Sequence, residues 1–218
     1  MGTHFTPSNS NFNGSTAQPQ PQPDPGAYRP EIVERMHQVF DRMLASHSRT
    51  LFLRFDLTYP ADLTYPADNA LLQWFAKELS KYLSGERQGE RADNAPKRKN
   101  LDPRYLWVRE QASHERHQHY HFALLLNGHR TQSIRGHLAL VETLWAQALG
   151  LSHAQGLVDY CQHGADGFEL DNGIMIRKDQ PDWQQKLAYC QKWSEYLCKT
   201  HEKGLAPPNI REFGSSRV

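Results

Sequence analysis

The run HYHFALLLN, from His119 to Asn127, limits what this chain can fold into more than any other stretch. In a β-strand every second side chain lies on the same face, so alternation divides the run into two sets. One face would be wholly apolar, and the other would begin with two neighbouring imidazoles. The apolar set is Tyr120, Phe122, Leu124 and Leu126, and the imidazoles are those of His119 and His121. The run therefore predicts a strand that carries two potential metal ligands.

Two imidazoles on one face of a strand can bind the same divalent ion, but two ligands alone leave a metal site incomplete. The segment 105–110 is aromatic and β-branched, which predicts a second strand, and it ends in Glu110. Residues 111–118 are polar enough to form a hairpin loop between the two strands. Glu110 would then lie beside His119 and His121 across an antiparallel pair, where the three side chains could form a metal site.

The alternative is that these histidines cluster by chance on a solvated surface. The chain has 12 histidines, and His114 and His117 fall in the same stretch as the predicted ligands. The metal site is favoured only because other parts of the chain fit the same chemistry.

Length and composition indicate one folded domain with an appended tail. A chain of 218 residues with 38% hydrophobic residues can form one core. Residues 1–29 are rich in Asn, Ser, Gln, Pro and Gly, and they cannot bury enough apolar surface to offset the entropy of ordering. We expect a disordered arm over residues 1–29 and a domain over residues 30–218.

Charge, cysteine content and hydropathy exclude several classes of protein. A formal net charge of +1 gives no general attraction to nucleic acid, so a polyanion site must be a local patch. The three cysteines are odd in number and lack metal-pair spacing, which favours a reducing cytoplasm. The longest apolar run, about five residues, cannot span a membrane, and no secretion signal is visible.

Hydrophobic periodicity predicts four helices and five strands, in the order helix, strand, helix, two strands, helix, two strands, helix. The helices are expected over residues 30–47, 71–83, 134–149 and 181–197, and the strands over residues 51–57, 105–110, 119–127, 156–161 and 174–176. A hairpin combined with helices between the other strands indicates an α+β fold on a mostly antiparallel sheet.

Two loops stand apart from this pattern. The hexapeptide DLTYPA occurs at residues 56–61 and again at 62–67. Six residues are too few for a solenoid repeat, so we interpret it as a duplication that lengthens the loop without chemistry of its own. The charged loop over residues 84–100 ends in Lys97, Arg98 and Lys99. Such a triplet is usually a solvated turn; the alternative is a nucleic-acid phosphate contact.

The last predicted helix carries a second candidate site. Tyr196 and Lys199 are three positions apart, which places a phenol and an ammonium on one helix face. A cation beside a tyrosine favours the phenolate and can also hold a phosphate oxygen. Alone, the pair could be a core ring and a surface charge. Joined with the metal site, it describes a tyrosine that attacks a phosphodiester polarised by a divalent ion.

In this order the motifs resemble those of the HUH endonucleases, which initiate rolling-circle replication. More narrowly, they resemble the inovirus-type replication proteins, the gene-two-like proteins of filamentous phages and related prophages. The resemblance extends from Leu51 to Arg217 and is carried by residues 53–57, 107–111, 119–127, 196–199 and 211–216.

The resemblance implies a central antiparallel sheet of about five strands flanked by helices, and a site-specific DNA nickase and strand transferase. Glu110, His119 and His121 would hold Mg²⁺ or Mn²⁺, and Lys199 would help to place the metal or the phosphate. Tyr196 would attack single-stranded DNA at a replication origin, leaving a 5′-phosphotyrosine and a 3′-hydroxyl for a host polymerase. A host helicase is a further candidate partner, and the bacterial cytoplasm is the implied location.

Several alternatives remain open. The Tyr-x-x-Lys pattern also occurs at residues 189–192, and some relatives use two tyrosines, although we expect Tyr189 to be a packed aromatic residue. A catalytically silent DNA-binding prophage protein on the same fold is the main alternative function. A metal-dependent phosphodiesterase without a covalent step would use the same ligands and ignore Tyr196.

Overall fold

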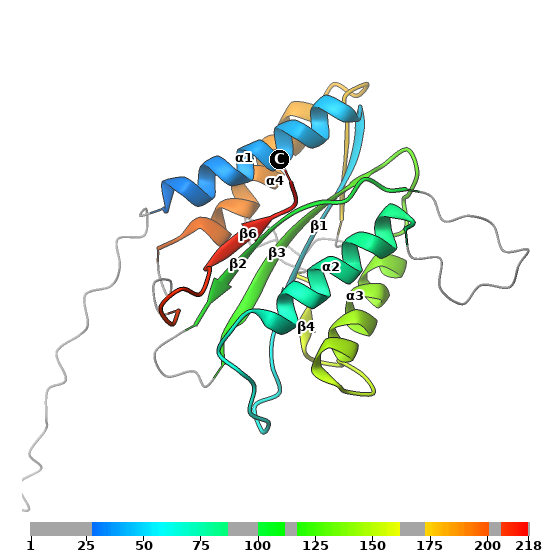
Figure 1. Ribbon diagram of the computed structural model, residues 1–218. Helices are drawn as coiled ribbons and strands as arrows, with labels where there is room; N and C mark the ends of the chain where they lie inside the picture. The colour runs from blue at the N-terminus through cyan, green and yellow to red at the C-terminus, as the bar shows by residue number, and fades with distance from the viewer. Residues whose placement is uncertain (1–27, 87–99, 112–116, 162–172, 201–205, 218) are drawn as a thin grey trace, which may run out of the picture.

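An antiparallel sheet lies between two layers of helices (Figure 1). The computed structural model describes residues 28–86, 100–111, 117–161, 173–200 and 206–217. Every strand pairing in these segments is antiparallel, and helices cover both faces of the sheet. The predicted α+β class, with a mostly antiparallel sheet flanked by helices, is confirmed.

The sheet is built around β3, the strand that the alternating pattern predicted. Its strands are β1 (Arg49–Leu57), β2 (Arg104–Glu110), β3 (His119–Asn127), β4 (Val158–Asp159), β5 (Ile174–Arg177) and β6 (Phe213–Ser215). β3 pairs with β1 on one side and with β2 on the other, and β6 continues beyond β2 as an edge strand. On the far side, β4 and β5 both pair with β1, at opposite ends of that strand.

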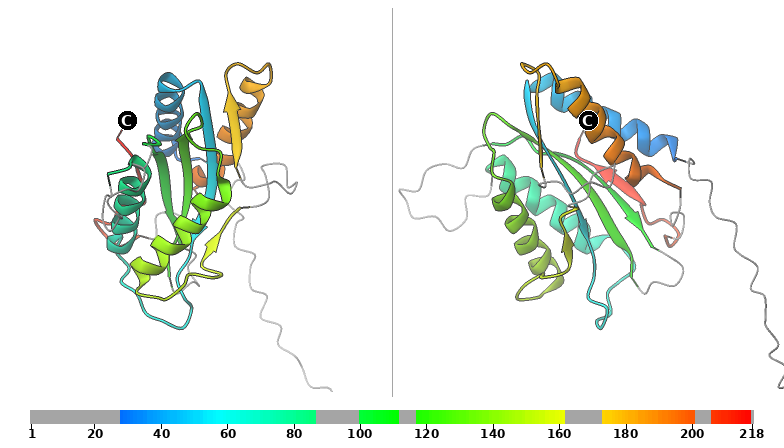
Figure 2. Two further views of the ribbon diagram at one scale, coloured as in Figure 1. Left: turned by 90° about the vertical axis from the view of Figure 1, so that its right-hand side faces the viewer. Right: turned by 180° about the vertical axis from the view of Figure 1, so that it is seen from behind.

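The helices form two pairs, one on each face of the sheet. They are α1 (Pro30–Ser46), α2 (Ala70–Ser84), α3 (Ile134–Leu149) and α4 (Trp183–Glu195), followed by the short 3₁₀ helix η1 (Tyr196–Cys198). α1, α4 and η1 pack on one face, and α2 and α3 pack on the other. Figure 2 shows α2 and α4 on opposite sides of the sheet.

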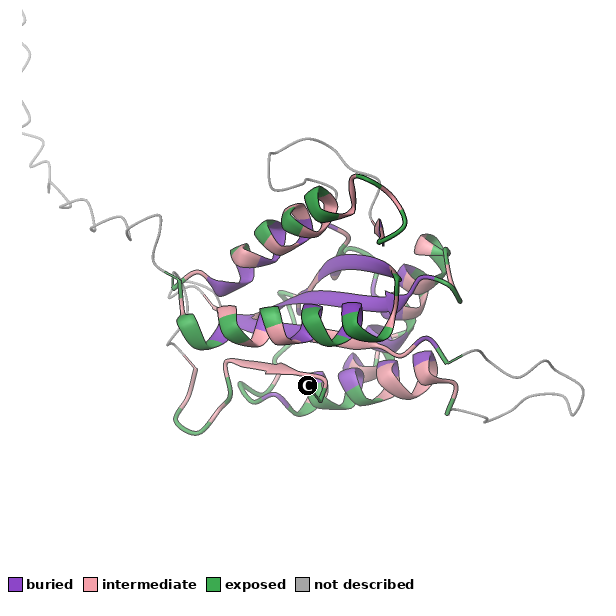
Figure 3. Cartoon of the chain, turned by 90° about the horizontal axis from the view of Figure 1, so that it is seen from above, coloured by how far each residue is buried: buried purple, intermediate pink, exposed green. Residues whose placement is uncertain are grey.

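The alternation of β3 divides the core into two clusters, as the sequence predicted. The apolar set that begins with Tyr120 faces α2 and α3. On the opposite face, Ala123 and Leu125 pack under α1 and α4, so His119 and His121 open toward that helical layer. Figure 3 shows the central strands buried between helices whose outer faces are exposed.

Local sequence explains where the helices begin and end. Pro30 opens α1, where its missing N–H is not needed. The hydroxyl of Ser133 accepts a hydrogen bond from the Gly136 N–H at the start of α3. Gly85 and Gly150 end α2 and α3 with φ of 80° and 71°, a left-handed conformation that suits glycine.

The structure differs from the predicted elements mainly at their ends, and it adds the strand β6, which was not predicted. The strand expected over residues 156–161 is only the two residues of β4, because only Val158 and Asp159 pair with β1. The last helix begins at Trp183 rather than at Pro181, and its final turn tightens into η1.

The predicted arm, residues 1–29, lies outside the described residues except for its last two. Tyr28 forms a β-bridge with Lys199, and the Arg29 N–H donates to the Cys198 carbonyl. The three cysteines are buried, and none of them forms a disulfide. No helix in the described segments has the length and apolar character needed to cross a membrane.

We expect Phe75→Ala to destabilise the protein by roughly 3–5 kcal/mol, because it leaves a cavity in a fully packed core. Phe75 is completely buried and contacts the rings of Phe55, Phe122 and Trp145. Its neighbour Trp74 is 39% exposed on the same helix, so Trp74→Ala should cost less than about 1 kcal/mol. Urea unfolding of both variants measures the difference; equal losses would contradict this packing.

Candidate metal centre

The register of the sheet brings the three predicted metal ligands together. In the β2–β3 pair, Glu110 lies directly opposite His119. His121 follows two residues later and points to the same face. The hairpin arrangement expected from the sequence is therefore present.

The donor atoms of these three residues converge on one point. His119 Nε2 lies 3.5 Å from Glu110 Oε2, and His121 Nε2 contacts the same carboxylate oxygen. One donor atom from each residue lies within 4.8 Å of the others. Glu110 and His121 are buried, whereas His119 is half-buried at the mouth of the site.

Asp56 on β1 is a fourth member of the site that was not singled out from the sequence. It lies opposite His121 in the β1–β3 pair, and its Oδ1 is 2.8 Å from His121 Nδ1, the distance of an ion pair. A carboxylate on the far nitrogen orients an imidazole and directs Nε2 toward a metal. The available signal was a pair of charges, Arg54 and Asp56, at alternate positions of an otherwise apolar strand.

The two carboxylates determine the charge of the site. Burial lowers the pKa of His121, but Asp56 and Glu110 outweigh this effect and raise it to about 9. For Asp56, burial raises the pKa, while His121 and Arg54 lower it more. A positive charge is thus favoured between Glu110 and Asp56. The imidazoles of His119 and His121 and the carboxylate of Glu110 are all metal ligands, so the set fits a divalent cation.

Tyr196 lies beside this centre, on the turn that follows α4. Its ring centroid is 5.7 Å from that of His121, and the side chain is 45% exposed. The Arg54 guanidinium lies 5.0 Å, and the Lys199 Nζ 4.4 Å, from the centre of the Tyr196 ring. The pairing of Tyr196 with Lys199 is as predicted, but a 3₁₀ turn produces it instead of a continuous helix face.

The other candidates lie away from the centre or outside the described residues. Tyr189 is half-buried with its ring 6.3 Å from that of Trp193, as expected for a packed aromatic residue. His117 belongs to the opposite face, where its Nε2 lies 2.7 Å from the Leu63 carbonyl oxygen. The basic triplet Lys97, Arg98 and Lys99 lies outside the described residues.

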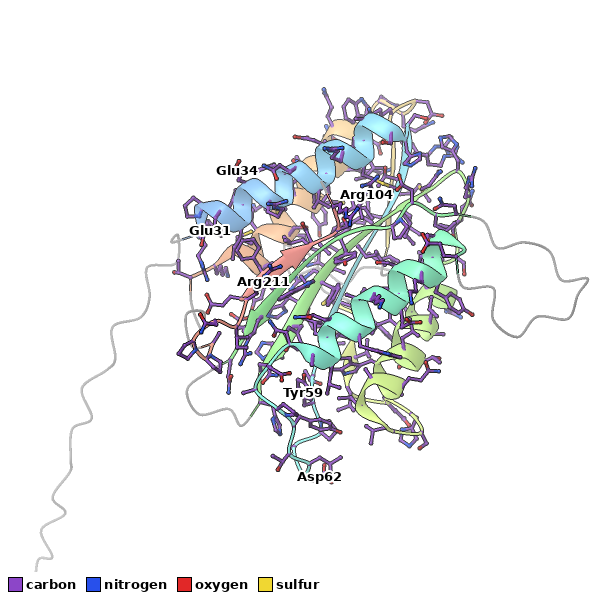
Figure 4. All side chains as sticks on the ribbon, in the orientation of Figure 1. Glu31, Glu34, Tyr59, Asp62, Arg104 and Arg211 are labelled. Atoms are coloured by element: carbon purple, nitrogen blue, oxygen red, sulfur yellow. The ribbon has the colours of Figure 1, made fainter. Side chains whose placement is uncertain are left out.

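The duplicated hexapeptide packs at the end of the sheet and contributes one residue to the site. In the first copy, Asp56 faces His121 and Tyr59 is buried against Trp145. In the second copy, Asp62 is exposed, and Tyr65 packs on Tyr59 with ring centroids 5.0 Å apart. Figure 4 shows Tyr59 and Asp62 in the loop beyond the sheet. The duplication does lengthen this loop, but its first copy also holds part of the site.

Comparison with known proteins gives a family without a stated activity. The family model described as the YagK/YfjJ C-terminal domain matches residues 21–216. The chain is 26% identical over 207 residues to the "Uncharacterized protein YfjJ" of Escherichia coli (strain K12), covering 84% of this chain and 92% of that protein. No solved structure matches the chain. These names mention neither replication nor a nuclease, so any function has to be argued from the site.

We expect His119→Ala and His121→Ala each to weaken Mn²⁺ binding by more than about tenfold, because each removes one of three converging donors. His117→Ala should leave the affinity unchanged, since this ring lies on the opposite face. Isothermal titration with MnCl₂ measures all three variants. Equal affinity of the His119 and His121 variants and the wild type would contradict a metal centre here.

The two copies of the hexapeptide provide a matched pair for testing Asp56. We expect Asp56→Asn to lower Mn²⁺ affinity by roughly 10–100-fold, because the carboxylate that orients His121 loses its charge. Asp62→Asn, at the equivalent position of the second copy, should have no effect because Asp62 is exposed. A loss of affinity in both variants would point to the loop rather than to the contact between Asp56 and His121.

Proposed function

The chain belongs to the YagK/YfjJ C-terminal domain family, and from the site it carries we propose that it is a metal-dependent DNA nickase and strand transferase that initiates rolling-circle replication. One observation carries the proposal: the ring of the exposed Tyr196 lies beside the cluster of Glu110, His119 and His121. Its centroid is 5.7 Å from the centroid of the His121 imidazole. A nucleophile beside a cluster of metal donors is the arrangement that phosphodiester cleavage through a covalent intermediate requires.

The donor set supports a transition-metal ion more than Mg²⁺. Magnesium prefers an octahedral shell of oxygen ligands, whereas imidazoles are common ligands of transition metals. Of the two expected ions, Mn²⁺ therefore fits Glu110, His119 and His121 better. When bound, such an ion would withdraw electron density from the phosphate and make the phosphorus atom more electrophilic.

The chain's own residues supply the nucleophile and the positive charge around it. The phenol oxygen of Tyr196 forms a bond to phosphorus as the bond from phosphorus to the 3′-oxygen breaks. The 3′-oxygen receives the proton that the phenol gives up, so the products are a 5′-phosphotyrosine and a 3′-hydroxyl. Lys199 and Arg54, both next to the Tyr196 ring, stabilise the negative charge that develops there. Attack by a 3′-hydroxyl reverses the step and transfers the strand.

Single-stranded DNA is the substrate that the geometry favours. Glu110 and His121 are 6% and 4% exposed, so the scissile phosphate must reach a recessed position beside the sheet. A flexible single strand can do this, whereas a rigid duplex cannot. The released 3′-hydroxyl can prime a host polymerase, with a host helicase to open the duplex. This chemistry belongs in the cytoplasm of a bacterial host.

The decisive test is the covalent adduct. Tyr196→Phe removes one oxygen and keeps the ring, so we expect metal and DNA binding to persist while no protein–DNA adduct forms. Tyr189→Phe is the matched control and should keep adduct formation. Lys199→Ala should slow the reaction about 10²-fold without abolishing it. Single-stranded origin DNA of the parent replicon, Mn²⁺ and a denaturing gel measure all three.

Each other outcome selects a different function. An adduct that survives in Tyr196→Phe and is lost in Tyr189→Phe would make Tyr189 the nucleophile. Cleavage by the wild type without an adduct would indicate a phosphodiesterase that uses only the metal ligands. DNA binding without cleavage would indicate a catalytically silent DNA-binding protein.

A further inference from the structure

A basic groove follows the β6 edge of the sheet, on the face opposite the metal centre. It has a volume of about 1140 Å³. One wall is the face of α2 that runs from Asn69 to Ser84, which is about 22 Å long at 1.5 Å per residue. The other wall is formed by the start of β2 and by residues 209–217. In Figure 4, Arg211 and Arg104 lie near opposite ends of β6.

Positive charge predominates along this groove. Five cations line it, Lys77, Lys81, Arg104, Arg211 and Arg217, against the three acids Asp68, Glu86 and Asp102. Asp102 is already paired with Arg104 at 3.0 Å, and Lys81 with Glu78 at 3.0 Å. Within the described segments, the side chains of Lys77, Arg211 and Arg217 form no ion pair. A chain with a net charge of only +1 thus gathers several cations in one place.

The near end of the groove is attached to the metal centre through the backbone. The Arg211 carbonyl accepts a hydrogen bond from Asn69 Nδ2 at 2.7 Å. The next carbonyl, that of Glu212, accepts from the N–H of Arg109 at 2.7 Å. Arg109 immediately precedes Glu110, so this end of the groove lies one residue along β2 from a metal ligand.

A second groove continues the path onto the face that carries the metal centre. It has a volume of about 770 Å³ and lies between the start of α1 and the same C-terminal segment. Arg29, which is ion-paired with Glu31 and Glu212, and Arg35 line it from the α1 side, while Arg211 and Arg217 line both grooves. The backbone N–H of Arg29 donates a hydrogen bond to the carbonyl of Cys198, the residue before Lys199. The two grooves thus lie on either side of β6, and Arg29 connects the second groove through the backbone to the residue before Lys199.

We propose that these two grooves form the track for single-stranded DNA, with Lys77, Arg211 and Arg217 contacting phosphates beyond the one that is cleaved. This inference rests on the proposed nickase, because it takes the strand from the metal centre around the β6 edge. Charge complementarity and the connection to Glu110 favour a flexible polyanion. A single strand can bend around the edge between the two grooves, and a duplex cannot.

Charged residues beside an edge strand have another known role, because they prevent strands of different molecules from pairing. Arg211 and Arg217 flank β6 and could act in this way. Lys77 could not, since it lies across the groove on α2. DNA binding and aggregation, measured on a variant that combines Lys77 with Arg211, therefore distinguish DNA contact from edge protection.

The test compares two double variants with the same net charge, both in the Tyr196→Phe background so that no cleavage occurs. Lys77→Ala with Arg211→Ala removes cations from opposite walls of the groove. Arg42→Ala with Arg135→Ala removes exposed cations that line neither groove. The probe is a fluorescent oligothymidylate of about 20 nucleotides, longer than the sites of about 4–16 nucleotides that single-strand-binding folds cover. Fluorescence anisotropy at several salt concentrations gives the affinity and its salt dependence.

We expect the groove variant to bind the oligothymidylate about tenfold more weakly, and the slope of log affinity against log salt to fall by about 1.4, or 0.7 for each lost phosphate contact. The control variant should stay within about twofold of its parent. Four results would each overturn the track. Two concern the variants: equal losses of affinity in the groove and control variants, or aggregation of the groove variant with unchanged binding. The other two concern the probe: tighter binding of a matched duplex, or no binding of single strands.

The nickase is judged separately, by the adduct formed with unmodified Tyr196. If the wild type forms an adduct and the groove variant binds DNA as tightly as its parent, the track is wrong and the nickase stands. If the groove variant binds DNA more weakly but the wild type forms no adduct, the track stands and the nickase is wrong.

Discussion

The β1–β3–β2 register is the constraint on which the site depends. Pairing of Asp56 with His121 and of Glu110 with His119 places four polar side chains in a row across three strands. A shift of one residue in either pairing would turn one strand's polar residues toward the apolar cluster under α2 and α3. The large buried rings on that other face, among them Phe55 and Phe122, hold the register in place.

The polar row itself contributes little to the stability of the sheet. Removing charges from water costs about as much as their mutual attraction returns, so a buried set such as Asp56, His121 and Glu110 roughly breaks even. The set is tolerable because His121 lies between the two carboxylates and can balance their charge. Such a costly arrangement at the end of three strands, beside an exposed Tyr196, is what favours a chemical role over a structural one.

The end of α4 and the β6 edge determine how a substrate could reach this row. Because α4 tightens into η1, Tyr196 leaves the core while Leu197 and Cys198 stay buried beneath it. The C-terminal segment then pairs with β2 and brings Arg211 and Arg217 to the open edge. The proposed nucleophile and one wall of each groove thus come from the last part of the chain, and the candidate metal ligands come from its middle.

The sequence alone determined whatever depends on neighbours along the chain. Period two in residues 119–127 predicted β3 and its two faces, and a short polar loop to Glu110 predicted the hairpin, because hairpin register is set locally. Only the tertiary structure joined Asp56 to His121 and folded residues 209–217 along β2, since these contacts unite segments far apart in the chain. Their pairing is decided by packing of the whole sheet, which no local pattern records.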